Sequence, residues 1–173
     1  HADHVSGLKE LNKQTDCAIL MGEKSLSEVV TIKVKDNEKI KIENTELISM
    51  YTPGHTDCSY SFLMKDRIFT GDTLLINGTG RTDFQNGNPI DQYHSLFDRI
   101  LTLPEEIFVY PAHDYKGQKF STIGHEKKNN PRLKVKSADQ YAELMNNLNL
   151  DNPKMMDIAV PANIKGKTLN QAD

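Results

Sequence analysis

The sequence contains few cysteines and no run of apolar residues long enough to cross a bilayer. Its two cysteines, Cys17 and Cys58, are too few for a disulfide framework and fit a reducing compartment. No stretch approaches the roughly 20 apolar residues that a transmembrane helix requires, and the opening His1-Ala2-Asp3-His4 lacks the basic and apolar regions of a signal peptide. We therefore expect an intracellular protein without a membrane partner, cytoplasmic in a bacterium and in the mitochondrial matrix in a eukaryote.

The chain also lacks an excess of positive charge. Its formal net charge is −3 at pH 7, which gives no general attraction to nucleic acid or to an anionic membrane. The expected partner is therefore a small-molecule substrate, and the composition leaves a homo-oligomer open. The sequence has no internal repeat or low-complexity linker, and 37% hydrophobic residues are enough for one core. We predict a single domain over residues 1–173.

The spacing of apolar residues predicts an α/β protein. Short segments with β-branched residues predict strands over 29–34, 39–42, 46–51, 60–64, 67–70 and 107–110. The turn residues Asp36-Asn37 predict a hairpin between the first two strands. Helical spacing predicts one helix capped by Asp91 and ending before Pro104, and another that starts at Ser137 with Gln140 completing a capping box.

Four short clusters hold most of the neighbouring histidine and carboxylate side chains, and three of them follow predicted strands. The clusters are His1-Ala2-Asp3-His4, Gly54-His55-Thr56-Asp57, Gly71-Asp72 and Ala112-His113-Asp114. Imidazole and carboxylate together suit divalent zinc, iron or manganese, whereas the two cysteines lack the spacing of a thiolate site. Each cluster alone reads as a surface histidine or a turn aspartate, but the four together favour a metal site.

Longer strings around these clusters resemble the successive motifs of the metallo-β-lactamase superfamily. The strings are HADH at the start, TPGHTD, TGDTLLINGTGRTDFQ and YPAHDYKG. GTGRTDFQ, with the later NPRL, NLNL and AVPAN, is similar to one branch, the persulfide dioxygenases, and the similarity covers nearly the whole chain. The resemblance implies an αββα sandwich with the metal at one edge of its two sheets. It also implies an enzyme of sulfide oxidation that converts glutathione persulfide, oxygen and water to glutathione and sulfite.

Carried over position by position, the resemblance makes His1, His55 and Asp72 the ligands of one iron(II) ion per site. Two imidazoles and one carboxylate can occupy one face of an octahedral iron and leave positions open for substrate and oxygen. Zinc is the alternative metal. The resemblance gives Asp3, His4, His113 and Asp114 the role of orienting ligands and water through hydrogen bonds. In zinc hydrolases of the superfamily, the positions of Asp3, His4 and His113 instead build a second metal site.

The resemblance also assigns Arg81 to the glutathione moiety, because a guanidinium fork suits a carboxylate. A surface ion pair is the alternative for this residue. Tyr115 either lines the same pocket or is a structural tyrosine. Cys58 has no dedicated base nearby in the sequence and is interpreted as a packed thiol. His94 and His125 are interpreted as structural or surface residues.

The chain opens inside the HxHxDH motif of the family, so we expect it to lack the N-terminal strands of the sandwich and to be the C-terminal part of the complete fold. Two other functions stay open. One is a glyoxalase II-like hydrolase that cleaves glutathione thioesters with two metal ions. The other is an inactive, truncated binding module.

Overall fold

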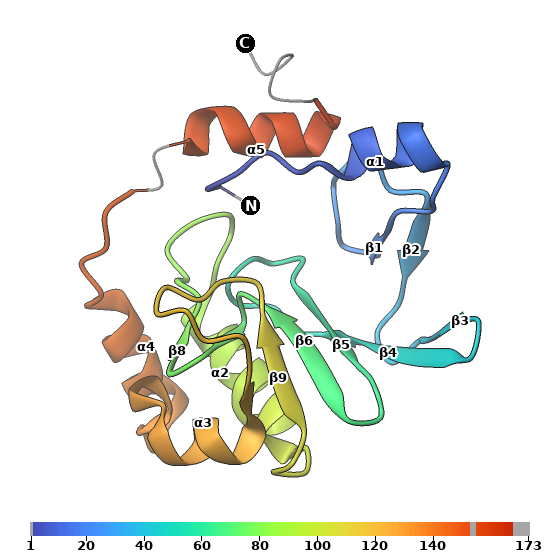
Figure 1. Ribbon diagram of the computed structural model, residues 1–173. Helices are drawn as coiled ribbons and strands as arrows, with labels where there is room; N and C mark the ends of the chain where they lie inside the picture. Colours follow the sequence, from blue (N-terminus) through green and yellow to red (C-terminus); the bar gives the residue numbers. More distant parts are fainter. Residues whose placement is uncertain (1, 153–154, 168–173) are drawn as a thin grey trace. The chain divides into compact units, whose positions relative to one another are not determined.

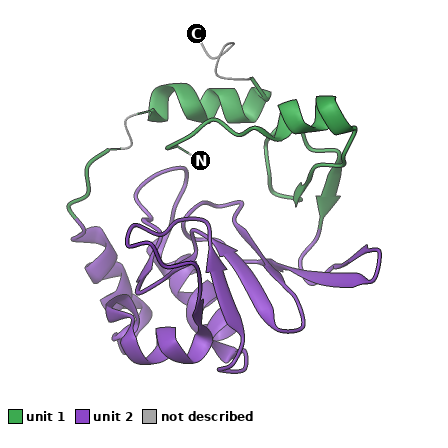
Figure 2. Cartoon of the chain, viewed as in Figure 1, with its two compact units in different colours: residues 1–34, 149–173 green, residues 35–148 purple. Residues whose placement is uncertain are grey.

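The computed structural model describes residues 2–152 and 155–167 (Figure 1). Its residues fall into two compact units, which Figure 2 colours separately. The first unit comprises residues 1–34 and 149–173, and the second comprises residues 35–148. Each unit is described by itself below.

The first unit combines two short strands with two helices. β1 (Leu20–Gly22) pairs in parallel with β2 (Ile32–Val34), and the helices are α1 (Leu8–Thr15) and α5 (Met156–Lys165). The N-terminal and C-terminal segments of this unit are hydrogen-bonded to each other, since Glu28 N donates to the carbonyl of Ile164 on α5 at 2.8 Å. The sequence predicts neither helix, and the strand predicted over 29–34 is shorter than expected.

The second unit is built on a six-stranded sheet in the order β10-β9-β6-β5-β4-β3. All neighbouring strands are antiparallel except β6 and β9, which run parallel. The strands are β3 (Lys39–Ile42), β4 (Thr45–Tyr51), β5 (Tyr60–Leu63), β6 (Arg67–Gly71), β9 (Phe108–Pro111) and β10 (Ser121–Thr122). Five of these strands confirm the sequence-based prediction to within a residue or two. The short hairpin β7 (Leu74–Leu75) and β8 (Gly78–Thr79) follows β6.

One predicted pairing is wrong. Residues 29–34 and 39–42 do not form a hairpin, because β2 pairs with β1 while β3 pairs with β4. The Asp36-Asn37 turn does exist, with Asn37 at φ 59°. The Asp36 side chain instead holds the end of β4 and Arg99, because its Oδ1 accepts from Tyr51 N at 2.7 Å and from Arg99 Nη2 at 2.8 Å.

The helices of the second unit are α2 (Pro89–His94), α3 (Ile123–Asn129) and α4 (Ala138–Asn146). The predicted cap of the first is displaced, since the Asn88 side chain accepts from the backbone of Ile90 and Asp91 and Pro89 occupies the first helical position, which needs no donor. After His94 the helix changes to a π-helical turn, η1 (Ser95–Arg99), and a 3-10 turn, η2 (Ile100–Thr102). A further 3-10 turn is η3 (Pro131–Leu133).

The predicted start of α4 at Ser137 is confirmed. Ser137 Oγ accepts from Gln140 N at 3.3 Å, and Gln140 Oε1 accepts from Lys136 N at 2.8 Å. The first bond satisfies a donor that the first helical turn leaves without a partner, and the second holds the residue before the cap.

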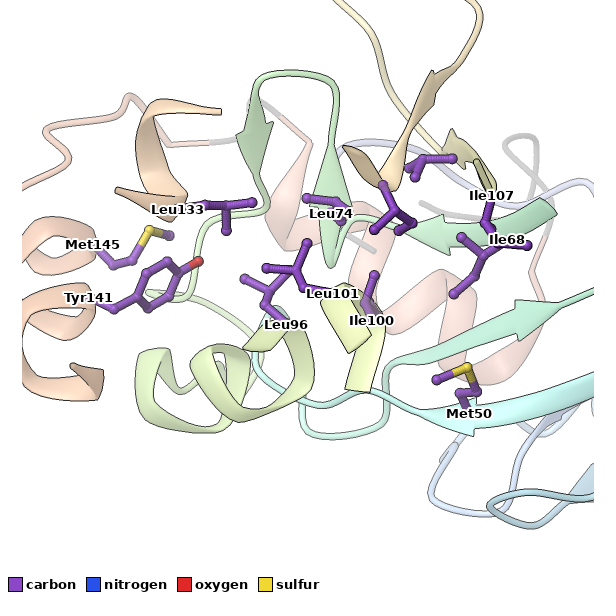
Figure 3. Close-up of a cluster of buried hydrophobic side chains, with 12 residues drawn as sticks. Met50, Ile68, Leu74, Leu96, Ile100, Leu101, Ile107, Leu133, Tyr141 and Met145 are labelled. Carbon is purple, nitrogen blue, oxygen red and sulfur yellow. The ribbon is translucent and has the colours of Figure 1, made fainter. Parts of the chain in front are cut away.

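The core of the second unit lies between the sheet and these helices (Figure 3). Met50, Ile68 and Val109 project from the sheet, and Leu96, Ile100 and Tyr141 meet them from the helical side. Complete burial of a Leu or Ile side chain contributes about 1.5–3 kcal/mol, so this layer fixes η1, η2 and α4 against the sheet. Within the described part of the chain, no helix is both long and apolar enough to span a membrane.

Candidate metal centre

Three of the predicted clusters meet at one edge of the sheet. His55 lies in the loop after β4, Asp72 directly follows β6, and His113 follows β9. These three strands run in the same direction, because β5 is antiparallel to both β4 and β6 while β9 is parallel to β6. Their carboxyl ends therefore open on the same edge, which explains why clusters far apart in the sequence come together.

Asp72 is the centre of the group. Its side chain is only 7% exposed, and Oδ1 lies 2.6 Å from His113 Nδ1 while Oδ2 lies 3.5 Å from His55 Nε2. An ionised carboxylate can only accept, so the contact with His113 is a hydrogen bond donated by Nδ1–H. Asp72 thus stands between two imidazoles, each facing a different oxygen of the carboxylate.

His55 is oriented so that a nitrogen lone pair faces Asp72. Its Nδ1 lies 2.8 Å from the carbonyl oxygen of Arg81. Because that oxygen is an acceptor, Nδ1 carries the proton, and in the neutral ring Nε2 carries the lone pair. A backbone carbonyl on the far nitrogen is the usual arrangement of a metal-binding histidine. A lone pair and a carboxylate oxygen facing each other at 3.5 Å are the donors that a divalent cation brings together, so this pair fits a metal.

Gly80 allows the segment before Arg81 to approach the two candidate ligands. A Cβ atom at this position would lie 2.0 Å from the carbonyl oxygen of Asp72 and 2.9 Å from His55 Nδ1. Gly80 N also donates to the carbonyl of Asp72 at 2.8 Å. Any larger residue would therefore separate the Arg81 carbonyl from the imidazole that it orients. The sequence shows the glycine but not this close approach.

The loop that leads to His55 is held along its whole backbone. Each carbonyl from residue 51 to residue 54 accepts a hydrogen bond. Three of the donors belong to residues 88–99, which contain α2 and η1, and one belongs to the segment after Asp72. The donors are Arg99 Nη1 to Tyr51, Thr73 Oγ1 to Thr52, Ser95 Oγ to Pro53 and Asn88 N to Gly54. The last three distances are 3.2, 2.6 and 2.8 Å. The helix therefore fixes where His55 stands.

Arg81 takes part in the site through two different groups. Its carbonyl holds His55, while its guanidinium forms a two-pronged ion pair with Asp83, with Nε–Oδ1 and Nη2–Oδ2 distances of 2.7 Å. The guanidinium also lies 4.3 Å from the centroid of the Phe84 ring. The hydrogen bond from Arg81 holds the pKa of the Asp83 carboxyl below its usual range. The fork is thus shaped for a carboxylate, which here is supplied by Asp83.

The loop after β9 carries three predicted residues in different surroundings. His113 contacts Asp72, and the ring of Tyr115 stacks on the His113 ring with centroids 6.1 Å apart and an interplanar angle of 5°. Tyr115 is 84% exposed, so it is not a buried structural tyrosine. Asp114 Oδ2 accepts from the backbone of Lys116 and Gln118, at 2.9 and 2.6 Å, and this shapes the loop itself.

The remaining predicted residues belong to the first unit. His1 lies outside the described residues. Asp3 and His4 are exposed and contact each other, with Oδ1 and Nδ1 2.9 Å apart. Asn163 on α5 holds their segment, because its Nδ2 donates to the His4 carbonyl and its Oδ1 accepts from Ser6 N. The AVPAN string therefore ends on a residue that positions the first cluster, a role that the sequence does not reveal.

Three residues that are predicted to lie outside the metal site have structural partners. Cys58 is half-buried, and its Sγ lies 3.5 Å from Thr56 Oγ1. His94 Nδ1 pairs with Asp98 Oδ2 at 2.7 Å on an exposed helical face. His125 contacts Asn77 and Asn129 through its two ring nitrogens. These contacts agree with packing and surface roles.

Comparisons with known proteins bear on both the fold and the site. The profile of the metallo-beta-lactamase superfamily matches residues 24–113. The mitochondrial persulfide dioxygenase ETHE1 of Homo sapiens is 39% identical over 168 residues, which cover 95% of this chain and 65% of the relative. A hydroxyacylglutathione hydrolase of Pelagibacter ubique is 34% identical over 151 residues, which cover 83% of this chain and 61% of the relative.

Among solved structures, the crystal structure of ETHE1 from Myxococcus xanthus superposes with a TM-score of 0.93 and 42% identity, over 97% of this chain and 74% of that chain. This chain therefore spans less than two thirds of the length of the two curated relatives and about three quarters of the crystallised one. The α/β fold of the metallo-β-lactamase type and the similarity to persulfide dioxygenases, both predicted from the motifs, are confirmed.

Proposed function

Because this chain belongs to the metallo-β-lactamase superfamily and is similar to persulfide dioxygenases over nearly its whole length, we propose that it is an iron(II) dioxygenase of glutathione persulfide. One persulfide, one oxygen molecule and one water yield glutathione, sulfite and two protons. The two sulfur atoms of the persulfide together lose four electrons as the outer one becomes sulfite and the inner one a thiol, and these four electrons reduce the oxygen molecule. Iron suits this chemistry because it can exchange electrons with oxygen, whereas zinc has no redox change.

The observation that carries the proposal of a single metal is the contact between His113 and Asp72. A bridging carboxylate in a two-metal hydrolase needs both oxygens for metal ions and a histidine free to bind the second ion. Here His113 donates to Asp72 Oδ1 at 2.6 Å. One carboxylate oxygen is thus engaged by a histidine, which supports a role for His113 in orienting Asp72.

Under this proposal His1, His55 and Asp72 hold one iron(II) ion, and Asp3, His4, His113 and Asp114 orient ligands and water. His55 is prepared for this role by the Arg81 carbonyl, which fixes the proton on Nδ1. Asp72 accepts a hydrogen bond from the His113 imidazole, and its low exposure restricts access of bulk water. The iron, when bound, supplies the electron transfer between sulfur and oxygen.

The substrate side of the site consists of Arg81 and Tyr115. The Arg81 guanidinium already accommodates the Asp83 carboxylate. We propose that a carboxylate of the glutathione moiety either replaces Asp83 or binds the guanidinium together with it. The Tyr115 ring, stacked on His113 and largely exposed, offers a flat surface beside the site. A substrate of this polarity accords with the expected intracellular location, in the cytoplasm of a bacterium or the mitochondrion of a eukaryote.

A second candidate is a hydrolase of glutathione thioesters that uses two metal ions. It is favoured by the 34% identity to a hydroxyacylglutathione hydrolase and by the pairing of Asp3 with His4. It would activate water on zinc, whose bound water has a pKa of about 7, and would consume no oxygen. An inactive binding module, the third alternative, would hold no metal.

Oxygen uptake distinguishes these functions. The assay uses this chain extended at its N-terminus to complete the HxHxDH motif of the family, loaded with iron(II) or, as the matched control, with zinc. We expect the iron protein to consume one oxygen per glutathione persulfide and to release sulfite, and the zinc protein to do neither. Cleavage of lactoylglutathione without oxygen uptake would contradict the dioxygenase and favour the hydrolase, and a protein that retains no metal would favour the inactive module.

A further inference from the structure

A buried tyrosine connects the two segments that fix His55. Tyr141 on α4 is fully buried, and its hydroxyl lies 2.8 Å from Gln92 Oε1 and 2.9 Å from Thr79 Oγ1. Gln92 belongs to α2 and Thr79 to β8, so one phenol joins three elements. Gln92 and Thr79 are themselves buried, with 0% and 2% exposure. Water therefore does not compete for these hydrogen bonds.

Gln92 adjoins His55 through Gly54. The backbone of Gly54 has φ +135°, and a Cβ atom there would lie 2.2–2.4 Å from the Cβ, Cα and N atoms of Gln92. The helix thus occupies the space that a side chain of residue 54 would need. Any shift of Gln92 moves the residue directly before His55.

Thr79 adjoins His55 from the opposite direction. It is followed by Gly80, which packs against His55 Nδ1 and the Asp72 carbonyl, and then by Arg81, whose carbonyl orients the His55 ring. The contacts close a ring that runs from His55 through Gly54, Gln92, Tyr141, Thr79 and Arg81 back to His55. In the side-chain part of this ring, Tyr141 is the link between the two segments.

The donors in this ring have a defined order. The amide oxygen of Gln92 can only accept, so the phenol donates to Gln92 and the Thr79 hydroxyl donates to the phenol oxygen. Thr79 Oγ1 in turn lies 3.3 Å from Arg132 Nη1, which also donates to the Thr79 carbonyl. Burial raises the pKa of Tyr141 above its usual range, so its proton is retained throughout the physiological range.

We propose that Tyr141 is a positioning residue that sets the affinity of the metal site, by holding the Arg81 carbonyl in register with the His55 imidazole. Tyr141 contacts neither His55 nor Asp72 and acts through Gln92 and Thr79. The inference rests on the proposed metal-binding role of His55. Loss of a group that hydrogen-bonds directly to a metal ligand, as the Arg81 carbonyl does to His55, typically weakens metal binding by about 10- to 100-fold. We expect an effect of this size for Tyr141, because it holds that carbonyl in place.

The test compares two substitutions that each delete one phenolic hydroxyl from the same core. Tyr141→Phe removes the link. Tyr93→Phe is the matched control, because Tyr93 stacks on Phe97 and packs near Tyr141 but, among the described residues, forms no hydrogen bond with Gln92 or Thr79. Affinities for iron(II) and zinc are measured by competition with a chelator. We expect Tyr141→Phe to bind both metals about 10- to 100-fold more weakly and Tyr93→Phe to stay within about twofold of the wild type.

A second pair of variants separates positioning from general loss of stability. Thr79→Val removes the hydroxyl at nearly constant volume and should weaken metal binding as Tyr141→Phe does. Thr79→Ser keeps the hydroxyl, so its metal affinity should stay near the wild-type value. The double variant Tyr141→Phe/Thr79→Val should bind metal no more weakly than the weaker single variant, because both changes break the same link. If Tyr141→Phe fails to fold, the two Thr79 variants decide the question.

Two results would overturn the inference. One is unchanged metal affinity in Tyr141→Phe and Thr79→Val, and the other is an equal loss in Tyr93→Phe. Neither bears on the reaction, which the oxygen assay tests separately. A wild-type protein that binds iron but consumes no oxygen would contradict the dioxygenase, while the metal affinities of the variants would still decide the role of Tyr141.

Discussion

The two sides of the candidate site differ in how firmly their side chains are held. On the metal side, Asp72 is 7% exposed and His55 is 13% exposed, and both have fixed partners from other loops. On the substrate side, Asp83 is 53% exposed and Tyr115 is 84% exposed. Arg81 belongs to both sides, since its carbonyl orients His55 while its guanidinium points to Asp83.

This difference matches what each task requires. A metal site needs its ligands within about 0.5 Å of their working positions, and buried hydrogen bonds supply that accuracy. A side chain that receives a substrate must exchange one partner for another, which exposed groups do at low cost because water competes for them. Changes on the metal side should therefore alter metal content, and changes on the substrate side should alter the Michaelis constant alone.

The largest effect is expected from Asp72→Ala, which removes the central carboxylate. Loss of a ligand should weaken iron(II) binding by more than the roughly 100-fold upper range for an orienting partner, so the dialysed protein should retain almost no metal. Elemental analysis after dialysis measures this. His94→Ala is the control, because it removes an exposed histidine that pairs with Asp98. Full metal content in Asp72→Ala would exclude Asp72 as a ligand.

Arg81→Ala should raise the Michaelis constant for glutathione persulfide and leave metal content unchanged. A charge-assisted hydrogen bond contributes about 1.5–3 kcal/mol, which corresponds to about a ten- to hundredfold change. The metal content should survive because His55 is held by the backbone carbonyl, which alanine retains. Steady-state kinetics and metal analysis on the same preparation test both parts, and unchanged kinetic constants would remove Arg81 from the substrate side.

Gly80→Ala should disturb both sides at once. The added Cβ would lie 2.0 Å from the Asp72 carbonyl oxygen, so the segment must shift, and overpacking of this kind costs about 1–3 kcal/mol of unfolding free energy. Gly78→Ala is the matched control two residues earlier, where the nearest atom is Leu75 Cβ at 4.0 Å. Chemical denaturation measures both variants. Equal stability of the two would show that the close approach at Gly80 is not constraining.

The smallest effect is expected for Asp83→Asn, which removes the ion pair with Arg81. The hydrogen bond from Arg81 lowers the pKa of Asp83 from its ordinary value of 3.8. A lowered pKa in the folded state stabilises the protein above pH 3.8, and this stabilisation is lost as the pH falls through the folded value. Because Asp83 is largely exposed, the contribution should stay below about 1 kcal/mol. Denaturation at several pH values should show a shallower acid loss in Asp83→Asn than in the wild type, and parallel curves would contradict the pairing.

The sequence predicts well what depends on local pattern. Strands followed by His and Asp clusters are visible as short segments with β-branched residues, and the start of α4 at Ser137 is encoded within four residues. The interruption of the long helix after His94 is different. There the helix adopts a π turn, and Arg99 at its end donates hydrogen bonds to the Tyr51 carbonyl and to Asp36, which lie far away in the sequence.

The candidate site was predictable as a set of ligand types and not as a set of contacts. The clusters identify His55, Asp72 and His113, yet the hydrogen bond between Asp72 and His113 spans 41 positions, and that between His4 and Asn163 spans 159. No local rule connects such residues, because their proximity follows from strand order and from the join between the chain ends. The same holds for Tyr141, because no local pattern indicates the contacts that its hydroxyl makes with Gln92 and Thr79.

The parallel pairing of β6 with β9 has a consequence for the order of events during synthesis. Asp72 follows the first of these strands and His113 follows the second, 41 residues later. At about 5–20 residues per second, a ribosome adds the second residue roughly 2–8 s after the first. During that interval Asp72 lacks His113, the second of its two imidazole partners, and β6 lacks β9 as a neighbour. A metal ion captured by the nascent chain would therefore meet an incomplete set of groups, so accurate loading belongs after β9 has emerged and paired.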